Sequence, residues 1–117
     1  KTLGWASINF MNDAYNGYDA HTFVHETGHT YGLYDYYDYN DKWSPMGGID
    51  MMDHNLGDHS AFSKFTLGWV NPLVVDDSSI ITLRPTTTTG DCFILPSPNY
   101  NGTAFDEYIM NIWHLLV

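Results

Sequence analysis

The segment His25-Glu26-Thr27-Gly28-His29-Thr30-Tyr31-Gly32-Leu33-Tyr34-Asp35 constrains this chain more than any other. Two histidines four residues apart lie on one face of a helix, because an α-helix completes a turn in about 3.6 residues. Such a pair can bind one zinc ion through a nitrogen of each ring. We therefore expect a helix over residues 20–31, capped by Asp19, that presents His25 and His29 to a metal ion.

A catalytic zinc ion has three protein ligands and one open position, so a third ligand is needed. Gly32 can adopt the left-handed conformation that ends a helix and turns the chain back. Asp35 follows three residues later and can complete the ligand set, with Asp38 and Asp41 as nearby alternatives. Glu26 adjoins the first histidine, and we expect it to accept a proton from a zinc-activated water.

This spacing, HExxHxxGxxD, resembles the extended zinc motif of the metzincin metallopeptidases, most of which have histidine where this chain has Asp35. Metzincins also place a methionine on a tight turn beneath the zinc, and Met46, Met51 and Met52 are the candidates for it. The run Gly48–Met52 resembles the Gly-x-Asp-x-Met segment of the immune inhibitor A family, and this selects Met52.

Two further positions extend the resemblance to the immune inhibitor A family. The run His59–Trp69 resembles the helix that follows the methionine turn, so we expect a second helix, capped by Asp58 and ended by Gly68. His54 stands where some metzincins carry a tyrosine that polarises the substrate carbonyl, which implies a catalytic role for His54. A histidine satisfied by backbone or water is the alternative. The matched segments cover roughly residues 22–75.

After residue 70 the sequence becomes rich in β-formers interrupted by Pro, Gly, Asn and Asp. We predict an α+β chain with a metzincin-like catalytic core over residues 1–71 and a small antiparallel β region over residues 72–117. Expected strands lie within residues 72–75, 79–84, 91–95 and 105–116, with a loop at 86–90. Only some twenty residues precede the zinc helix, too few for the substrate-binding sheet of metzincins. Either the chain is a piece of a larger enzyme or it has a reduced fold, and we expect a fragment lacking that N-terminal sheet.

Charge and composition limit the partners. Four Lys and Arg against fourteen Asp and Glu give a net charge of −10, which disfavours nucleic-acid binding. No apolar run is long enough to span a membrane. We expect a secreted or extracellular protein, and the acidity fits that location, calcium-binding carboxylates or simple solubility, the last being the default. The single cysteine, Cys92, excludes an internal disulfide framework. Asp38 and Asp41 could bind a structural Ca²⁺, the alternative being solvated loop acids.

These observations predict a zinc-dependent endopeptidase that hydrolyses protein or peptide substrates, with His25, His29 and Asp35 as ligands and Glu26 and His54 as catalytic residues. A second hypothesis is a non-catalytic zinc-binding or adhesion module derived from a metallopeptidase. Such a module would commonly have lost Glu26, which is intact here. A third is a structural α+β domain whose HExxH pattern arose by chance.

Overall fold

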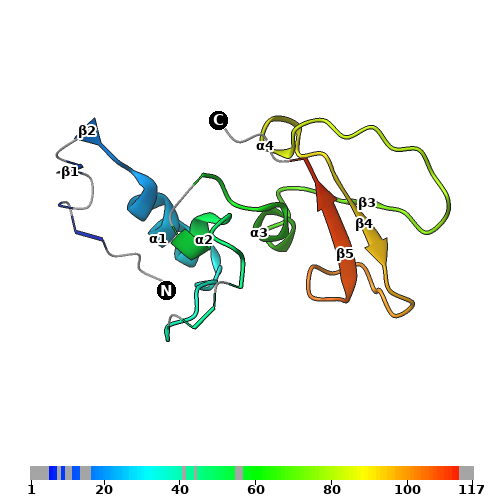
Figure 1. Cartoon of the computed structure of the whole chain (residues 1–117), viewed down its shortest axis with the longest axis horizontal. Helices are drawn as coiled ribbons and strands as arrows, with labels where there is room; N and C mark the ends of the chain where they lie inside the picture. The colour runs from blue at the N-terminus through cyan, green and yellow to red at the C-terminus, as the bar shows by residue number, and fades with distance from the viewer. Residues whose placement is uncertain are drawn as a thin grey trace. The chain divides into compact units, whose positions relative to one another are not determined.

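A computed structural model describes residues 6–7, 9, 12–13, 17–40, 42–43, 45–54 and 57–113 (Figure 1). The chain divides into two compact units, Lys1–Ser60 and Ala61–Val117, and each is described by itself. Helices and strands both occur, which is compatible with the predicted α+β class. In the described ranges, no helix has the length and apolarity needed to cross a membrane.

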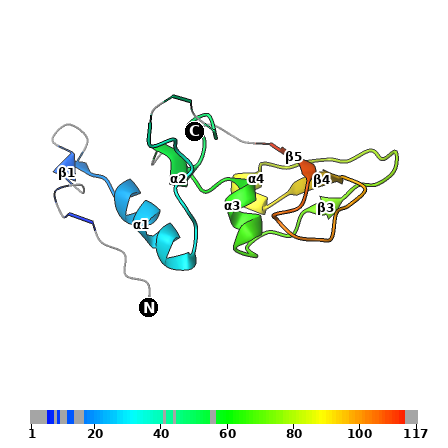
Figure 2. The same ribbon diagram turned by 90° about the horizontal axis from the view of Figure 1, so that it is seen from below.

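The first unit contains a short hairpin and two helices. Strands β1 (Asn12–Asp13) and β2 (Gly17–Tyr18) pair antiparallel and lead into α1 (His21–Tyr31). Helix α1 starts one residue later than predicted: Ala20 is its N-cap, and the Asp19 carboxylate accepts the His21 amide hydrogen at 2.8 Å. A four-residue helix, α2 (Met51–His54), packs against α1 in both views (Figures 1 and 2).

The interior of the first unit is formed where α2 meets α1. Leu33, Met51 and Met52 are its buried apolar side chains, and the two acids that flank the methionines, Asp50 and Asp53, are buried beside them. Buried carboxylates need hydrogen-bond partners to offset their lost hydration. This requirement explains the dense hydrogen bonding around α2.

The second unit consists of α3 (Ala61–Thr66), a helical turn and a three-stranded sheet. Strands β3 (Leu73–Val74), β4 (Cys92–Pro96) and β5 (Tyr108–Ile112) lie in the order β3-β4-β5. Strands β4 and β5 are antiparallel as predicted, with Ile94 opposite Met110. Strands β3 and β4 are parallel, with Leu73 opposite Phe93, so the sheet is mixed and the prediction of an antiparallel region was wrong for this pair.

The parallel pairing follows from the long connection between β3 and β4. Parallel neighbours need a crossover of about a dozen residues or more, and residues 75–91 supply it. The strand expected at 79–84 is absent from this described stretch, and the expected loop at 86–90 contains the helical turn α4 (Thr86–Thr89), which ends at Gly90 with φ of 75°. The Arg84 guanidinium binds the Asp91 carboxylate at 2.7 and 2.9 Å and closes the base of this turn.

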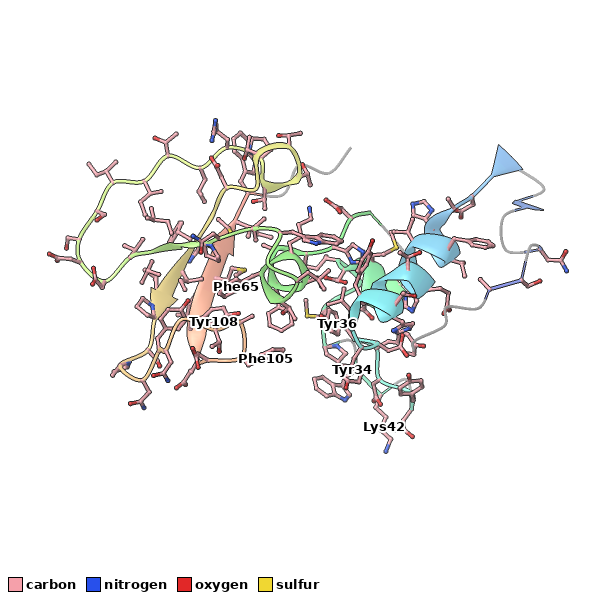
Figure 3. The ribbon with its side chains drawn as sticks, turned by 180° about the vertical axis from the view of Figure 1, so that it is seen from behind. Tyr34, Tyr36, Lys42, Phe65, Phe105 and Tyr108 are labelled. Atoms are coloured by element: carbon pink, nitrogen blue, oxygen red, sulfur yellow. The ribbon has the colours of Figure 1, made fainter. Side chains whose placement is uncertain are left out.

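Helix α3 packs on the sheet through aromatic side chains. Phe65 of α3 and Tyr108 of β5 make an edge contact with ring centroids 6.2 Å apart (Figure 3). Ile94 and Cys92 are buried on the central strand. The second predicted helix is therefore present, although it starts at Ala61, and Asp58 accepts the His59 amide hydrogen instead of capping the helix. Gly68 follows it with φ of 71°.

Candidate metal centre

Helix α1 carries the two histidines of the HExxH pattern on one face. Their rings are 4.8 Å apart between centroids and meet nearly at right angles, at 84°. His25 is buried, whereas the side chain of His29 is 29% exposed, so one side of the pair reaches solvent. The predicted helix thus brings both Nε2 atoms to one place.

The end of α1 delivers the third residue. Gly32 has φ of 103°, a left-handed conformation that costs a residue with a Cβ about 1–2 kcal/mol. Its amide donates to the His29 carbonyl at 3.0 Å, and the Leu33 amide donates to the Gly28 carbonyl at 3.1 Å. The chain then reverses, and Oδ1 of Asp35 lies 3.0 Å from His25 Nε2 and 3.2 Å from His29 Nε2.

Backbone carbonyls fix the tautomer of both histidines. His25 Nδ1 lies 2.8 Å from the Met51 carbonyl oxygen, and His29 Nδ1 lies 2.9 Å from the Leu33 carbonyl oxygen. A carbonyl can only accept, so each Nδ1 must donate its hydrogen. In a neutral ring the lone pair is then on Nε2, the atom that faces Asp35, and is available to a metal ion. In a protonated ring Nε2 carries a hydrogen and donates it to the Asp35 carboxylate. The neutral form is the usual arrangement of histidines that ligate metals.

The three side chains form a donor set that suits a divalent cation. Two Nε2 lone pairs and one carboxylate oxygen converge, and their ligand atoms all lie within 4.8 Å of one another. Ligands of tetrahedral zinc at about 2.0–2.2 Å are roughly 3.3–3.5 Å apart, only a few tenths of an ångström more than the separations from Asp35 Oδ1. His25, His29 and Asp35 can therefore hold a metal ion.

The Asp35 carboxyl group is held ionised by its neighbours. Burial alone would raise its pKa, but the hydrogen bond from Tyr39, the charge of His29 and hydrogen bonds from His25 and Tyr37 outweigh burial and lower the pKa. The Tyr39 hydroxyl donates to the second carboxylate oxygen, Oδ2. In return, the hydrogen bond to Asp35 is the main cause of the raised pKa of Tyr39.

Met52 lies directly beneath the histidine helix. Its side chain is fully buried, and a Cβ added to Gly28 of α1 would lie 2.5 Å from Met52 Sδ. The close approach of the two elements therefore requires glycine at position 28. Met51 is also buried and Met46 is partly exposed, but Met52 is the methionine whose sulfur meets α1. Its role as the floor of a metal site remains a prediction.

Asp50 anchors the turn that carries Met51 and Met52, and sequence reasoning gave it no role. Its carboxylate is fully buried and accepts the amide hydrogens of Met52 at 2.7 Å and Ser60 at 2.8 Å. These bonds fix the backbone next to Met51, whose carbonyl orients His25. The Gly-x-Asp-x-Met pattern contained the relevant signal, since an aspartate two residues before an amide is a common local acceptor.

Two predicted catalytic residues have different surroundings. Glu26 follows His25 on α1 and is half-buried, and its charge contributes, after burial and the charge of Asp35, to the raised pKa of Tyr37. His54 is exposed at the end of α2, with Nδ1 2.8 Å from Asp53 Oδ1. This contact does not involve His25, His29 or Asp35, and the catalytic role of His54 remains a prediction.

The predicted calcium ligands are only partly described. The Asp38 carboxylate accepts the amide hydrogens of Asn40 at 3.0 Å and Lys42 at 3.2 Å, which closes a local turn. Asp41 lies outside the described residues. Within the described ranges, the group formed by His25, His29 and Asp35 is the one with three potential metal ligands.

The second unit contains a hollow of about 460 Å³, lined by Trp69, Val70, Asn71, Leu73, Ile81, Thr82, Leu83, Thr89, Gly90, Asp91 and Cys92. Cys92 is buried, and burial, followed by the charge of Asp91, raises the pKa of its thiol. A protonated, buried thiol is a poor nucleophile. Cys92 therefore acts as a small apolar residue of the sheet.

Comparisons with models of protein families, with curated proteins and with solved structures found no match for this chain. The functional interpretation therefore depends on the chemistry of the site itself.

Proposed function

We propose that this chain carries the catalytic core of a zinc-dependent endopeptidase. The observation that supports the proposal most strongly is the convergence of two tautomer-fixed imidazoles and one carboxylate, with a glutamate next to the first imidazole. Three protein ligands with one side open to solvent are typical of catalytic rather than structural zinc sites. The metzincin-like core over residues 1–71 and the immune inhibitor A resemblance belong to the same proposal.

His25, His29 and Asp35 would hold the ion. When bound, zinc supplies Lewis acidity and lowers the pKa of water to about 7. The chain's own contribution is orientation: the Met51 and Leu33 carbonyls keep both imidazoles in the ligating tautomer. His29 gives the site its solvent-facing side.

Glu26 is the proposed general base. It accepts a proton from the water that attacks the scissile carbonyl and then delivers this proton to the departing amine. In the HExxH pattern the glutamate next to the first histidine serves as the general base and is not a ligand. His54 is the proposed donor to the developing oxyanion of the substrate. We expect protein or peptide substrates and an extracellular location.

Glu26→Gln provides the test, with Glu107→Gln as control because Glu107 is the chain's other glutamate. The 117-residue chain would be supplied with Zn²⁺, analysed for bound metal and assayed with a quenched fluorescent peptide library. We expect about one Zn²⁺ per chain, and a loss of cleavage of roughly 10²–10⁴-fold in Glu26→Gln alone, as for removal of a general base.

Other outcomes would count against the enzyme. Zinc binding without peptide cleavage, in a protein that also includes the substrate-binding sheet expected upstream, supports the non-catalytic zinc module instead. A chain that takes up no zinc supports the structural domain, and equal cleavage by wild type and Glu26→Gln excludes Glu26 as the base.

A further inference from the structure

The two oxygens of the Asp35 carboxylate have different partners. Oδ1 faces the Nε2 atoms of His25 and His29 at 3.0 and 3.2 Å. Oδ2 accepts a hydrogen bond from the hydroxyl of Tyr39, four residues further along the chain. A carboxylate rotates readily about its last side-chain bond, so a partner on one oxygen determines which oxygen is presented to the imidazoles.

Tyr39 is an unusual residue for such a contact. Its side chain is 76% exposed, so it buries little apolar surface. Its contact with Asp35 is the hydrogen bond that its hydroxyl donates to Oδ2. The ring is supported on one side by Tyr37, with centroids 5.0 Å apart at 65°. Tyr37 in turn stacks on His25 at 6.5 Å and 26°. The two tyrosines thus connect a histidine and the aspartate of the same group.

We propose that Tyr39 is a positioning residue that directs Oδ1 of Asp35 toward His25 and His29 and thereby raises the affinity of the group for a divalent cation. The inference rests on the proposed function, because Tyr39 would support a ligand of the same metal site. Groups that hydrogen-bond to metal ligands fix ligand orientation, and their loss typically costs about 10–100-fold in metal affinity.

Tyr39→Phe removes the hydroxyl and keeps the ring, and Tyr34→Phe is the matched control. Tyr34 adjoins Asp35 and is 82% exposed on the same loop (Figure 3). The experiment measures Zn²⁺ affinity of the 117-residue chain by competition with a chromogenic chelator. It also records the visible absorption of the Co²⁺-loaded chain, which reports the ligand geometry and is insensitive to a change in fold stability alone.

We expect Tyr39→Phe to bind Zn²⁺ about 10–100-fold more weakly and to alter the Co²⁺ bands. Tyr34→Phe should match wild type in both measurements. Wild-type affinity and wild-type Co²⁺ bands in Tyr39→Phe would overturn this inference and leave the proposed function standing. Equal losses in both variants would also overturn it, since the effect would then not belong to the Asp35 contact. A wild-type chain that binds neither ion would defeat the proposed function and this inference together.

Discussion

Gly28→Ala tests whether Met52 of α2 packs against α1 as described. The new Cβ would lie 2.5 Å from Met52 Sδ, 3.2 Å from Met52 Cε and 3.3 Å from His59 Cε1. Met52 and His59 are both buried, so neither can move into solvent without losing packing. Overpacking of this kind costs about 1–3 kcal/mol.

A helix-propensity gain opposes this cost. Alanine is favoured over glycine in a helix interior by about 1 kcal/mol. Because the contact with Met52 Sδ is much closer than van der Waals distance, we place the overpacking cost in the upper half of its range. Gly28→Ala should therefore lower the free energy of unfolding by about 1–2 kcal/mol, the overpacking cost minus the propensity gain.

Met52→Ala provides the decisive background, because it removes the atoms that the new Cβ would meet most closely. In that background Gly28→Ala should become neutral or stabilise by up to about 1 kcal/mol, so the sign of its effect changes. Urea unfolding followed by circular dichroism measures all four proteins of this double-mutant cycle. If Gly28→Ala destabilises equally with and without the Met52 side chain, Met52 does not lie beneath α1 and the reasoning is refuted.

Three further predictions concern the site and the second unit. Zn²⁺ at a hundredfold excess over Kd should stabilise the wild-type chain by about 2.7 kcal/mol. Asp35→Asn should abolish this stabilisation. A chelator should lower the thermal unfolding temperature of the Zn²⁺-treated wild type and leave that of Asp35→Asn unchanged. Gly32→Ala should destabilise the chain by about 1–2 kcal/mol, because φ is 103° there, and chemical denaturation would contradict this if the midpoint were unchanged. Arg84 lowers the pKa of Asp91 to about 2, so the pair stabilises the fold above the ordinary pKa of 3.8 and this contribution disappears as the pH falls toward 2. The free energy of unfolding of Arg84→Gln should therefore fall less steeply than that of wild type over this pH range. If both proteins show the same pH dependence, the ion pair does not cause it.

The parts of the site that the sequence predicts are those fixed by local geometry. Helical spacing determines how His25 and His29 face each other, and a glycine that can take a left-handed conformation determines where the chain reverses. Asp35 follows within three residues, so little conformational freedom separates it from the imidazoles. The partner of His29 Nδ1 is equally local, since the Leu33 carbonyl is four residues away.

The remaining contacts depend on long-range packing, and spacing alone contains no information about them. The partner of His25 Nδ1 is the Met51 carbonyl, 26 residues away, and its position depends on the buried Asp50 carboxylate. The same limit applies in the second unit. Strand propensity identified the segments of β4 and β5, but the parallel pairing of Leu73 with Phe93 depends on where the long connection returns.

Local and long-range contacts together determine how the group formed by His25, His29 and Asp35 is organised. Both imidazoles owe their orientation to backbone carbonyls, and the Asp35 carboxylate is held by Tyr39, so each ligand is positioned by the protein itself. Ligands that are already oriented lose little conformational entropy when a cation binds, and more of the interaction energy then contributes to affinity. In a metal site that folds only around its ion, removal of the metal unfolds the chain. Here the packing of α2 against α1 should survive metal removal, so a chelator should lower the stability of the first unit without abolishing its fold.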